Sequence, residues 1–346
     1  MGVLLLTVGL GSLGAVVWLQ RSERGATPSS SAPRPERASL ALVDAASTGV
    51  AEDEGGSTLG DVVQPLEGHP IATGAEASTG LGIDVSEAIS AAEEEDDPTG
   101  PVARILVTAA GSSDAGRRRA HNEDAYLVLG RHGLFAIADG MGGYAAGEVA
   151  SQLALDTMRA AFEGGDLEGT KMPAVPRRGA ELIRSIQLAN TAILEQARSN
   201  EAQQGMGTTL VAARFSPNRQ RVYIAHVGDS RLYRLRGHDL TQLTTDHTLA
   251  ALGVQGPGSN KLSRAVGVFD DVEVDLSIDE PLVGDYYVLC SDGLSKMVPE
   301  GRIAELVRAR AGLEPTVQAL ISEANARGGK DNVTVILVRV DSPTPT

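Results

Sequence analysis

The chain has 346 residues, of which 42% are hydrophobic and 22% charged, and its formal net charge is -15. This length fits about two domains of ordinary globular composition. The negative charge excludes a general nucleic-acid-binding protein, because a duplex partner needs a basic face to displace its counterions. The acidity is concentrated up to Ala103, with 16 acidic residues against four arginines. The single cysteine, Cys290, excludes an internal disulfide and fits a reducing compartment.

Residues 1–20 are predicted to form a transmembrane anchor. The run from Gly2 to Leu19 is uncharged and mostly apolar, close to the roughly 20 residues that a membrane-spanning helix needs. A secretory signal peptide is the alternative, but the run lacks a preceding basic segment and a clear cleavage site. Arg21 and Arg24 follow it, so the positive-inside tendency predicts a single-pass membrane protein with the rest of the chain in the cytoplasm. If the leader is an irrelevant product of a misassigned start codon, the protein is instead soluble and cytoplasmic.

Residues 21–103 are predicted to be a disordered acidic linker. The segment is rich in alanine, glycine, serine, threonine, proline and acidic residues, and from Ser22 onward it contains no aromatic residue. Such a composition cannot bury enough apolar surface to offset the entropy lost on ordering. The acidic run at 93–97 is interpreted as solvated charge, with docking of a basic partner as the alternative.

Residues 104–341 are predicted to form the folded domain, followed by a tail at 342–346. Short apolar or β-branched runs predict strands, and apolar residues at helical spacing predict helices. The strands fall in clusters with helices between them, which favours an α+β domain with antiparallel sheets over a parallel β-α-β arrangement. The strand runs are 134–138, 209–213, 222–225, 286–289 and 333–337, and the helices are 147–162, 179–199 and 316–326.

Aspartates in or beside glycine-rich turns recur along this domain. Each one alone is best explained as a common turn residue. Together they suggest more, because Asp139, Asp229 and Asp292 each follow an apolar run, where carboxylates from distant segments can converge at one sheet edge. Converging carboxylates repel one another unless a cation lies among them. The segments are 113–116 with 121–124, 139–143, 228–231, 291–293 and 329–332.

Oxygen ligands without a cysteine or histidine cluster suit Mg²⁺ or Mn²⁺ rather than zinc. Two such ions can share a bridging hydroxide and orient it for in-line attack on a phosphate ester. The phosphate also needs a cationic clamp, and Arg119 lies five residues before Asp124. A guanidinium binds two phosphate oxygens at once. The alternative is that the Arg117-Arg118-Arg119 run is only a solvated basic turn.

The ordered motifs resemble the metal-dependent PPM phosphatase family, also called protein phosphatase 2C, in its bacterial form. The resemblance runs from about Ile105 to Val340. The motifs are Ser-Asp-x-Gly-x-x-Arg-x-x-Asn-Glu-Asp at 113–124, Asp-Gly-Met-Gly-Gly at 139–143, Gly-Met-Gly-Thr-Thr at 205–209, Gly-Asp-Ser-Arg at 228–231, Thr-Asp-His-Thr at 245–248, Ser-Asp-Gly-Leu at 291–294 and Gly-Gly-Lys-Asp-Asn-Val-Thr at 328–334.

The resemblance implies a four-layer α-β-β-α sandwich with two central antiparallel sheets and metal ions at one end. It implies hydrolysis of phosphoserine and phosphothreonine in proteins, by attack of a metal-bridging hydroxide on a phosphate held by Arg119. It also implies two Mn²⁺ or Mg²⁺ ions, with Asp229 contributing to a weaker third site, and a mobile flap over 249–264. The ligands implied for the two main ions are Asp124, Asp139, Asp292, Asp331, the Gly140 carbonyl and, through water, Glu123.

Two positions depart from the family pattern. Met141 stands where some members carry a histidine that protonates the leaving group, so the resemblance assigns no general acid. Lys296 stands four residues after Asp292, where relatives often have an acidic residue, and a cation there weakens a third metal site. His247 is a further possible proton donor, although a lone histidine in a turn is more often structural.

Three alternatives use the same residues differently: an inactive binding module, a calcium-binding domain, and a hydrolase of small phosphate esters. The retained aspartates and Arg119 argue against the first. The second is disfavoured because the aspartates are scattered and not packed into one loop of alternating ligands. The expected partners are phosphorylated serine/threonine proteins, including a membrane serine/threonine kinase, since tethering two proteins to one membrane raises their effective concentration.

Overall fold

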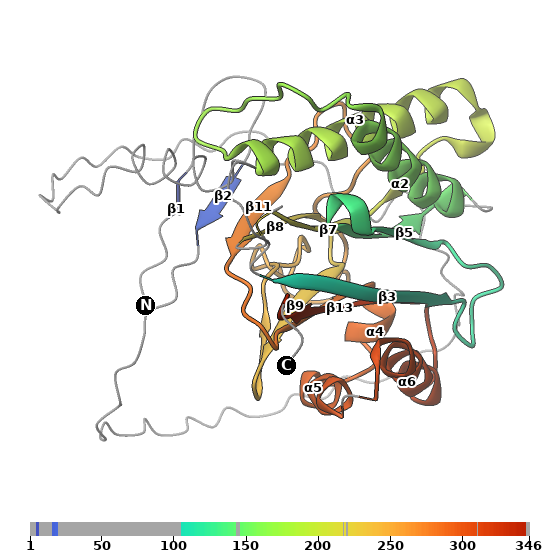
Figure 1. Ribbon diagram of the computed structural model, residues 1–346. Helices are drawn as coiled ribbons and strands as arrows, with labels where there is room; N and C mark the ends of the chain where they lie inside the picture. The colour runs from blue at the N-terminus through green and yellow to red at the C-terminus, as the bar shows by residue number, and fades with distance from the viewer. Residues whose placement is uncertain are drawn as a thin grey trace, which may run out of the picture.

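The structure, a computed structural model, has the predicted α+β architecture of four layers, helix–sheet–sheet–helix (Figure 1). The residues that it describes are 5–6, 16–19, 105–142, 146–216, 218, 221–309 and 311–343.

The first sheet pairs strands that are distant in the sequence. Its order is β1 (Leu5–Leu6), β2 (Val16–Leu19), β11 (Asp275–Asp279), β8 (Val222–Val227), β7 (Leu210–Phe215), β5 (Leu134–Met141) and β4 (Asp124–Leu129), with β6 (Gly207–Thr208) added to β5. Every described pairing in this sheet is antiparallel except that of β2 with β11.

The second sheet is antiparallel throughout its described strands. Its order is β10 (Asp239–Gln242), β9 (Arg231–Arg236), β12 (Tyr286–Cys290), β13 (Val333–Asp341) and β3 (Leu106–Asp114). The outer strand β3 pairs with β13 along its whole length.

Helices cover the outer face of each sheet, as Figure 1 shows. Those over the first sheet are α2 (Ala146–Gly164) and α3 (Arg177–Ser199), and those over the second are α4 (Asp292–Ser295), α5 (Glu300–Arg308) and α6 (Leu313–Ala326). Short 3-10 turns, η2 (Gly130–His132) and η3 (Glu201–Gln203), follow β4 and α3.

Three buried apolar clusters fill the three spaces between the layers. Strand β5 shows why, because successive side chains of a strand point to opposite faces. Ala136 and Ala138 pack with the helix-side cluster, whereas Phe135 and Ile137 pack between the sheets. Both faces of β5 are therefore apolar, which explains its continuous hydrophobic run.

The strand directions bring four chain segments to one end of the sandwich. The antiparallel register of β4 and β5 places Asp124 directly opposite Asp139. Strand β12 ends there and leads into α4, which begins at Asp292. Its partner β13 begins there, just after Asp331. Two sheets thus deliver four carboxylates to one end.

The predicted linker at 21–103 and most of the predicted anchor at 1–20 lie outside the described residues. The part of the anchor that is described contains strands and no helix, since β2 pairs with β11. Valine and tryptophan favour strands, and β11 otherwise leaves one edge unpaired. In the described part of the chain, no helix is both long and apolar enough to cross a bilayer.

Candidate metal centre

Four aspartates predicted to be ligands lie near one another at this end of the sandwich. Burial raises the pKa of Asp139 well above its ordinary value. The carboxylates of Asp124, Asp292 and Asp331 are close enough for their charges to raise it further. The centre therefore disfavours negative charge unless a cation is bound.

Asp124 is the most enclosed of these carboxylates. Its Oδ2 accepts hydrogen bonds from the hydroxyls of Ser291 and Thr334, each at 2.7 Å. Its Oδ1 is buried and has no hydrogen-bond partner among the described residues. Burial raises the pKa of Asp124 to about 7, against the lowering effect of the two hydroxyls. One oxygen is thus fixed by the protein, and the other is left for a ligand.

Asp292 has the same character. Its Oδ1 is buried without a hydrogen-bond partner in the described part of the chain, and burial raises its pKa to about 6. An unpartnered buried carboxylate oxygen is costly in a folded protein. Two such oxygens in one carboxylate cluster fit hard divalent cations, which prefer oxygen ligands.

Asn332 connects the loops that carry these aspartates. Its side-chain Nδ2 donates to the carbonyls of Ala115, at 3.0 Å, and His121, at 2.9 Å. Its Oδ1 accepts from the backbone N–H of Glu123 at 2.9 Å. The segment before Asp124 is therefore held to the segment that contains Asp331.

Glycines allow the close approach of backbones at this centre. A Cβ atom on Gly140 would lie 2.0 Å from the Gly147 carbonyl oxygen, and one on Gly147 would lie 2.6 Å from Glu123 Oε1. Glu123 is half-buried, and burial raises its pKa. The Gly140 backbone and the Glu123 side chain, both predicted to act on the ions, thus lie at the start of α2.

Arg119, the predicted phosphate clamp, reaches this centre and lies against Asp331. Its Nε is 2.9 Å from Asp331 Oδ1, and its Nη2 donates to Oδ2 at 3.0 Å. This pairing raises the pKa of Arg119. The side chain of Arg119 is thus exposed but paired with a predicted metal ligand.

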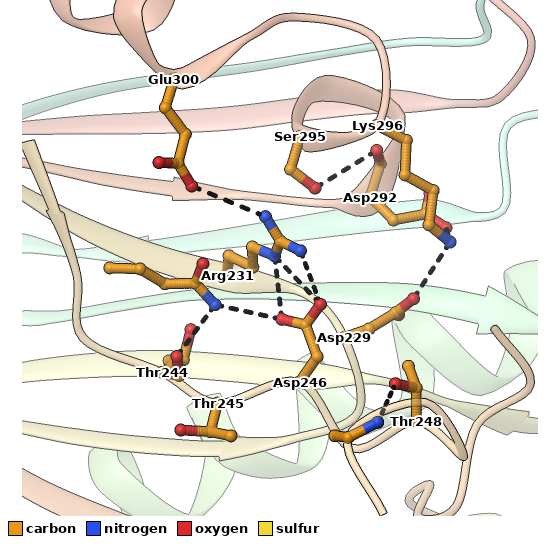
Figure 2. Close-up of polar contacts among 12 residues, drawn as sticks. Asp229, Arg231, Thr244, Thr245, Asp246, Thr248, Asp292, Ser295, Lys296 and Glu300 are labelled. Carbon is orange, nitrogen blue, oxygen red and sulfur yellow. Dashed lines mark hydrogen bonds and ion pairs between the residues drawn. The ribbon is translucent and has the colours of Figure 1, made fainter. Parts of the chain in front are cut away.

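Asp229, predicted to help form a third metal site, is paired with Lys296. Asp229 lies in the turn between β8 and β9, and its Oδ2 is 3.1 Å from Lys296 Nζ. The same ammonium group donates to Asp292 Oδ2, one helical turn earlier in the sequence. Figure 2 shows Lys296, which directly follows α4, extending toward Asp229.

A second group with metal-ligand geometry lies beside this turn. The ligand atoms of His226, His247 and Asp275 are within 4.8 Å of one another. Among the described residues, no other group of three or more such side chains, the four aspartates included, brings its ligand atoms this close together. His247 Nδ1 accepts from the Gly228 N–H at 3.2 Å, so its Nε2 carries the proton and faces Asp275 at 3.2 Å. Arg264 also donates to Asp275 at 2.6 Å. His247 thus links the backbone of the Asp229 turn to Asp275.

Other polar residues in the motifs stabilise loops. Arg231 of the Gly-Asp-Ser-Arg segment binds Asp246 at two points, with Nη2 2.7 Å from Oδ2 and Nε 2.8 Å from Oδ1 (Figure 2). Asp114 accepts from the Gly116 N–H at 2.8 Å and from Asn325 at 2.9 Å. Sequence reasoning missed the supporting roles of Ser291, Thr334 and Asn332. Their only signal is that Ser291 and Asn332 are adjacent to aspartates and that Thr334 lies shortly after Asp331.

The segment 249–264, predicted to be a flap, folds mainly into turns and bends. The N–H groups of Leu249 and Ala250 donate to carbonyls of Lys261 and Ser259 at 2.9 and 2.7 Å. Its glycines at 253, 256 and 258 all have positive φ, between 85° and 98°, a conformation in which glycine is favoured. This explains the glycine content of the segment, while its movement stays a prediction.

Comparisons with known proteins show the family of the chain. Residues 113–337 match the family model described as protein phosphatase 2C. The serine/threonine phosphatase stp of Listeria monocytogenes is 39% identical over 243 residues, which cover 66% of this chain and 94% of that protein. The serine/threonine protein phosphatase PstP of Mycobacterium tuberculosis is 38% identical over 250 residues, 68% of this chain and 45% of that protein.

Solved structures are similar over the same region. The catalytic domain of a phosphatase PstP in complex with two manganese ions has a TM-score of 0.59 and 37% identity, covering 69% of this chain and all of that one. Stp1 from Staphylococcus aureus has a TM-score of 0.60 and 30% identity, covering 68% of this chain and 96% of that one.

Proposed function

Because this chain belongs to the protein phosphatase 2C (PPM) family and is a metal-dependent serine/threonine protein phosphatase, we propose that it cleaves phosphoserine and phosphothreonine esters in proteins at the aspartate centre. The observation that carries this proposal is the pair of buried, unpartnered oxygens, Asp124 Oδ1 and Asp292 Oδ1. A site built from such oxygens requires cations, and phosphate-ester hydrolysis is a reaction for which two such ions are suited.

In this proposal the two Mn²⁺ or Mg²⁺ ions are held by Asp124, Asp139, Asp292 and Asp331, with the Gly140 carbonyl and, through water, Glu123. When bound, the ions supply Lewis-acid stabilisation of the phosphate and activate water for attack on phosphorus. Ser291 and Thr334 fix the carboxylate of Asp124 so that its free oxygen faces the centre. The protein thereby orients its ligands before the substrate arrives.

Arg119 would bind the substrate phosphate. A guanidinium can donate to two phosphate oxygens at once, as it now does to Asp331. Binding of a cation to Asp331 would weaken its hold on Arg119, because the carboxylate charge is then shared. Metal loading would thus free the arginine for the substrate.

The test is phosphate release by the full chain from a phosphothreonine peptide, with Mn²⁺ and with a chelator. We expect release only with Mn²⁺, and a loss of at least about 100-fold in Asp139→Asn, which removes one ligand charge. Asp156→Asn is the matched control, because Asp156 is an exposed aspartate on α2. It should keep full activity.

The same assay separates the alternatives. Ca²⁺ binding without release under any divalent ion would favour a calcium-binding domain, and a folded chain that binds no ion would favour a binding module. Faster turnover of p-nitrophenyl phosphate than of phosphopeptides at equal concentration would favour small phosphate esters.

A membrane location and a kinase partner are further proposals. Their support is the uncharged run from Gly2 to Leu19, since an anchor would concentrate the phosphatase near membrane-bound kinases. Membrane fractionation of the full chain tests the location, and recovery in the soluble fraction would contradict it. If deletion of residues 1–20 left the cellular phosphorylation pattern unchanged, tethering to a kinase would also be excluded.

A further inference from the structure

The side chain of Lys296 connects two carboxylates from different parts of the chain. It lies one helical turn after Asp292, so its side chain can fold back onto that carboxylate. It also meets Asp229, which comes from the turn after β8, with 3.1 Å between Nζ and Oδ2. The ammonium group thus lies between Asp229 and Asp292, as Figure 2 shows.

Asp229 needs a cation at this position. Its side chain is only 7% exposed, and burial of an ionised carboxylate is costly unless it is paired or binds a metal. Among the described residues, Lys296 is the only one that forms an ion pair with Asp229. Since the ammonium belongs to the residue that directly follows α4, it meets this need without any ion from solution.

The same geometry disfavours a divalent ion at Asp229. An ion that bridged Asp229 and Asp292 would have to occupy the space of the Lys296 ammonium or lie directly beside it. Two cations a few ångströms apart repel each other strongly where the surroundings are partly buried. The residues present therefore do not fit a third metal site.

We propose that Lys296 is a built-in cation of the centre, which replaces a third divalent ion between Asp229 and Asp292. This inference rests on the proposed function, in which two ions are held by the carboxylates of Asp124, Asp139, Asp292 and Asp331. The chain then binds two divalent ions and no third, and its dependence on metal concentration reflects two sites only.

The test counts the ions that bind to the metal-stripped full chain, by calorimetric titration with Mn²⁺ and by native mass spectrometry. We expect two ions for the wild type and three for Lys296→Asp, which removes the ammonium and adds a carboxylate beside Asp229. Lys171→Asp is the matched control, because it makes the same charge change at an exposed lysine outside the centre. It should bind two ions.

Three ions on the wild type, or no additional ion on a folded Lys296→Asp chain, would overturn the proposal. Circular dichroism reports whether that variant folds. If it does not, Lys296→Met decides, because it removes the charge and keeps most of the volume. We then expect the dissociation constant of the weakest Mn²⁺ site to fall about tenfold, and an unchanged constant would refute the inference.

Failure of the proposed function gives a different result. A folded wild-type chain that bound no Mn²⁺ and released no phosphate would contradict the phosphatase centre itself. A chain that bound three ions and released phosphate would contradict only the role of Lys296. The ion count and the phosphate assay together distinguish these cases.

Discussion

The guanidinium of Arg119 and the carboxylate of Asp331 form a two-point contact, with Nε 2.9 Å from Oδ1 and Nη2 3.0 Å from Oδ2. Both groups are proposed to leave this contact in the working enzyme, Asp331 for a metal ion and Arg119 for the substrate phosphate. The two partners are more than a third exposed, so the pair contributes less than about 1 kcal/mol. It is weak enough to open when ions bind.

Arg119→Ala should therefore have opposite effects on metal and substrate. Mn²⁺ affinity of the metal-stripped chain should rise by at most about fivefold, because a competitor for Asp331 is removed. The KM for a phosphothreonine peptide should rise about 10- to 100-fold, because a charge-assisted contact to phosphate is lost. Calorimetry and steady-state kinetics measure the two effects. Arg159→Ala, on the exposed face of α2, is the control, and a parallel loss of both affinities would contradict the exchange.

Thr334→Val should weaken the centre with little change of side-chain volume. It removes one of the two hydroxyl donors to Asp124 Oδ2, and a hydrogen bond to a buried charged group contributes about 1.5–3 kcal/mol. We expect a loss of about 2 kcal/mol in the free energy of unfolding at pH 7.5, together with weaker Mn²⁺ binding. Thr191→Val, on the exposed side of α3, should change neither. Equal denaturant midpoints for the two variants would argue against this role of Thr334.

Protonation should stabilise the metal-free chain, because burial raises the pKa of Asp124 to about 7 and that of Asp292 to about 6. A folded-state pKa above the unfolded value of about 4 contributes stability that is complete below about pH 4 and is lost as the pH rises through the folded pKa. Bound Mn²⁺ offsets this loss, since it needs the ionised carboxylates. The increase in Tm on adding Mn²⁺ should thus be larger at pH 7.5 than at pH 5, by about 5 °C.

Thermal unfolding of the full chain at both pH values, with Mn²⁺ and with chelator, measures this difference. Asp124→Asn is the informative variant, because it cannot ionise at this position. Its metal-free form should lose less stability between pH 5 and pH 7.5 than the wild type does. If both chains showed the same slope, the pH dependence would arise elsewhere in the protein.

The sequence predicts the strands whose two faces are both buried, such as β5 and β12, because continuous apolar runs mark them. It gives less information on strands such as β9, where arginines alternate with apolar residues and make ion pairs at the sheet surface. The short helix α4 has four residues and no apolar period to reveal it. The local apolar pattern thus indicates strands and helices that bury apolar side chains. It misses elements such as β9 and α4, which are stabilised by contacts with residues distant in the sequence.

The same distinction holds at the centre. Apolar runs that end in an aspartate predict that Asp139, Asp229 and Asp292 lie at one sheet edge, whereas Asp124 and Asp331 are implied as ligands only by the resemblance to the family. The partners of these aspartates are not predictable in this way. Lys296 meets Asp229 across 67 positions of sequence, a contact that only the folded chain defines. Motifs therefore indicate candidate ligands, and tertiary packing decides which of them already has a cation.

Gly293→Ala should separate two loops that carry aspartates. A Cβ atom at this position would lie 1.9 Å from the carbonyl oxygen of Asn332, so the loop before β13 must move away from α4. This displacement carries Asp331 away from Asp292, and errors of about 1 Å in such a site cost about 100-fold in rate. We therefore expect phosphopeptide hydrolysis to fall by at least about 100-fold, with a lower Tm, in the full chain with Mn²⁺.

The matched control is Gly301→Ala in α5, where a Cβ meets nothing within 4 Å and the helix should gain up to about 1 kcal/mol. A folded Gly293→Ala chain could instead keep activity within about twofold of the wild type. The contact between α4 and the Asp331 loop would then not position the aspartates.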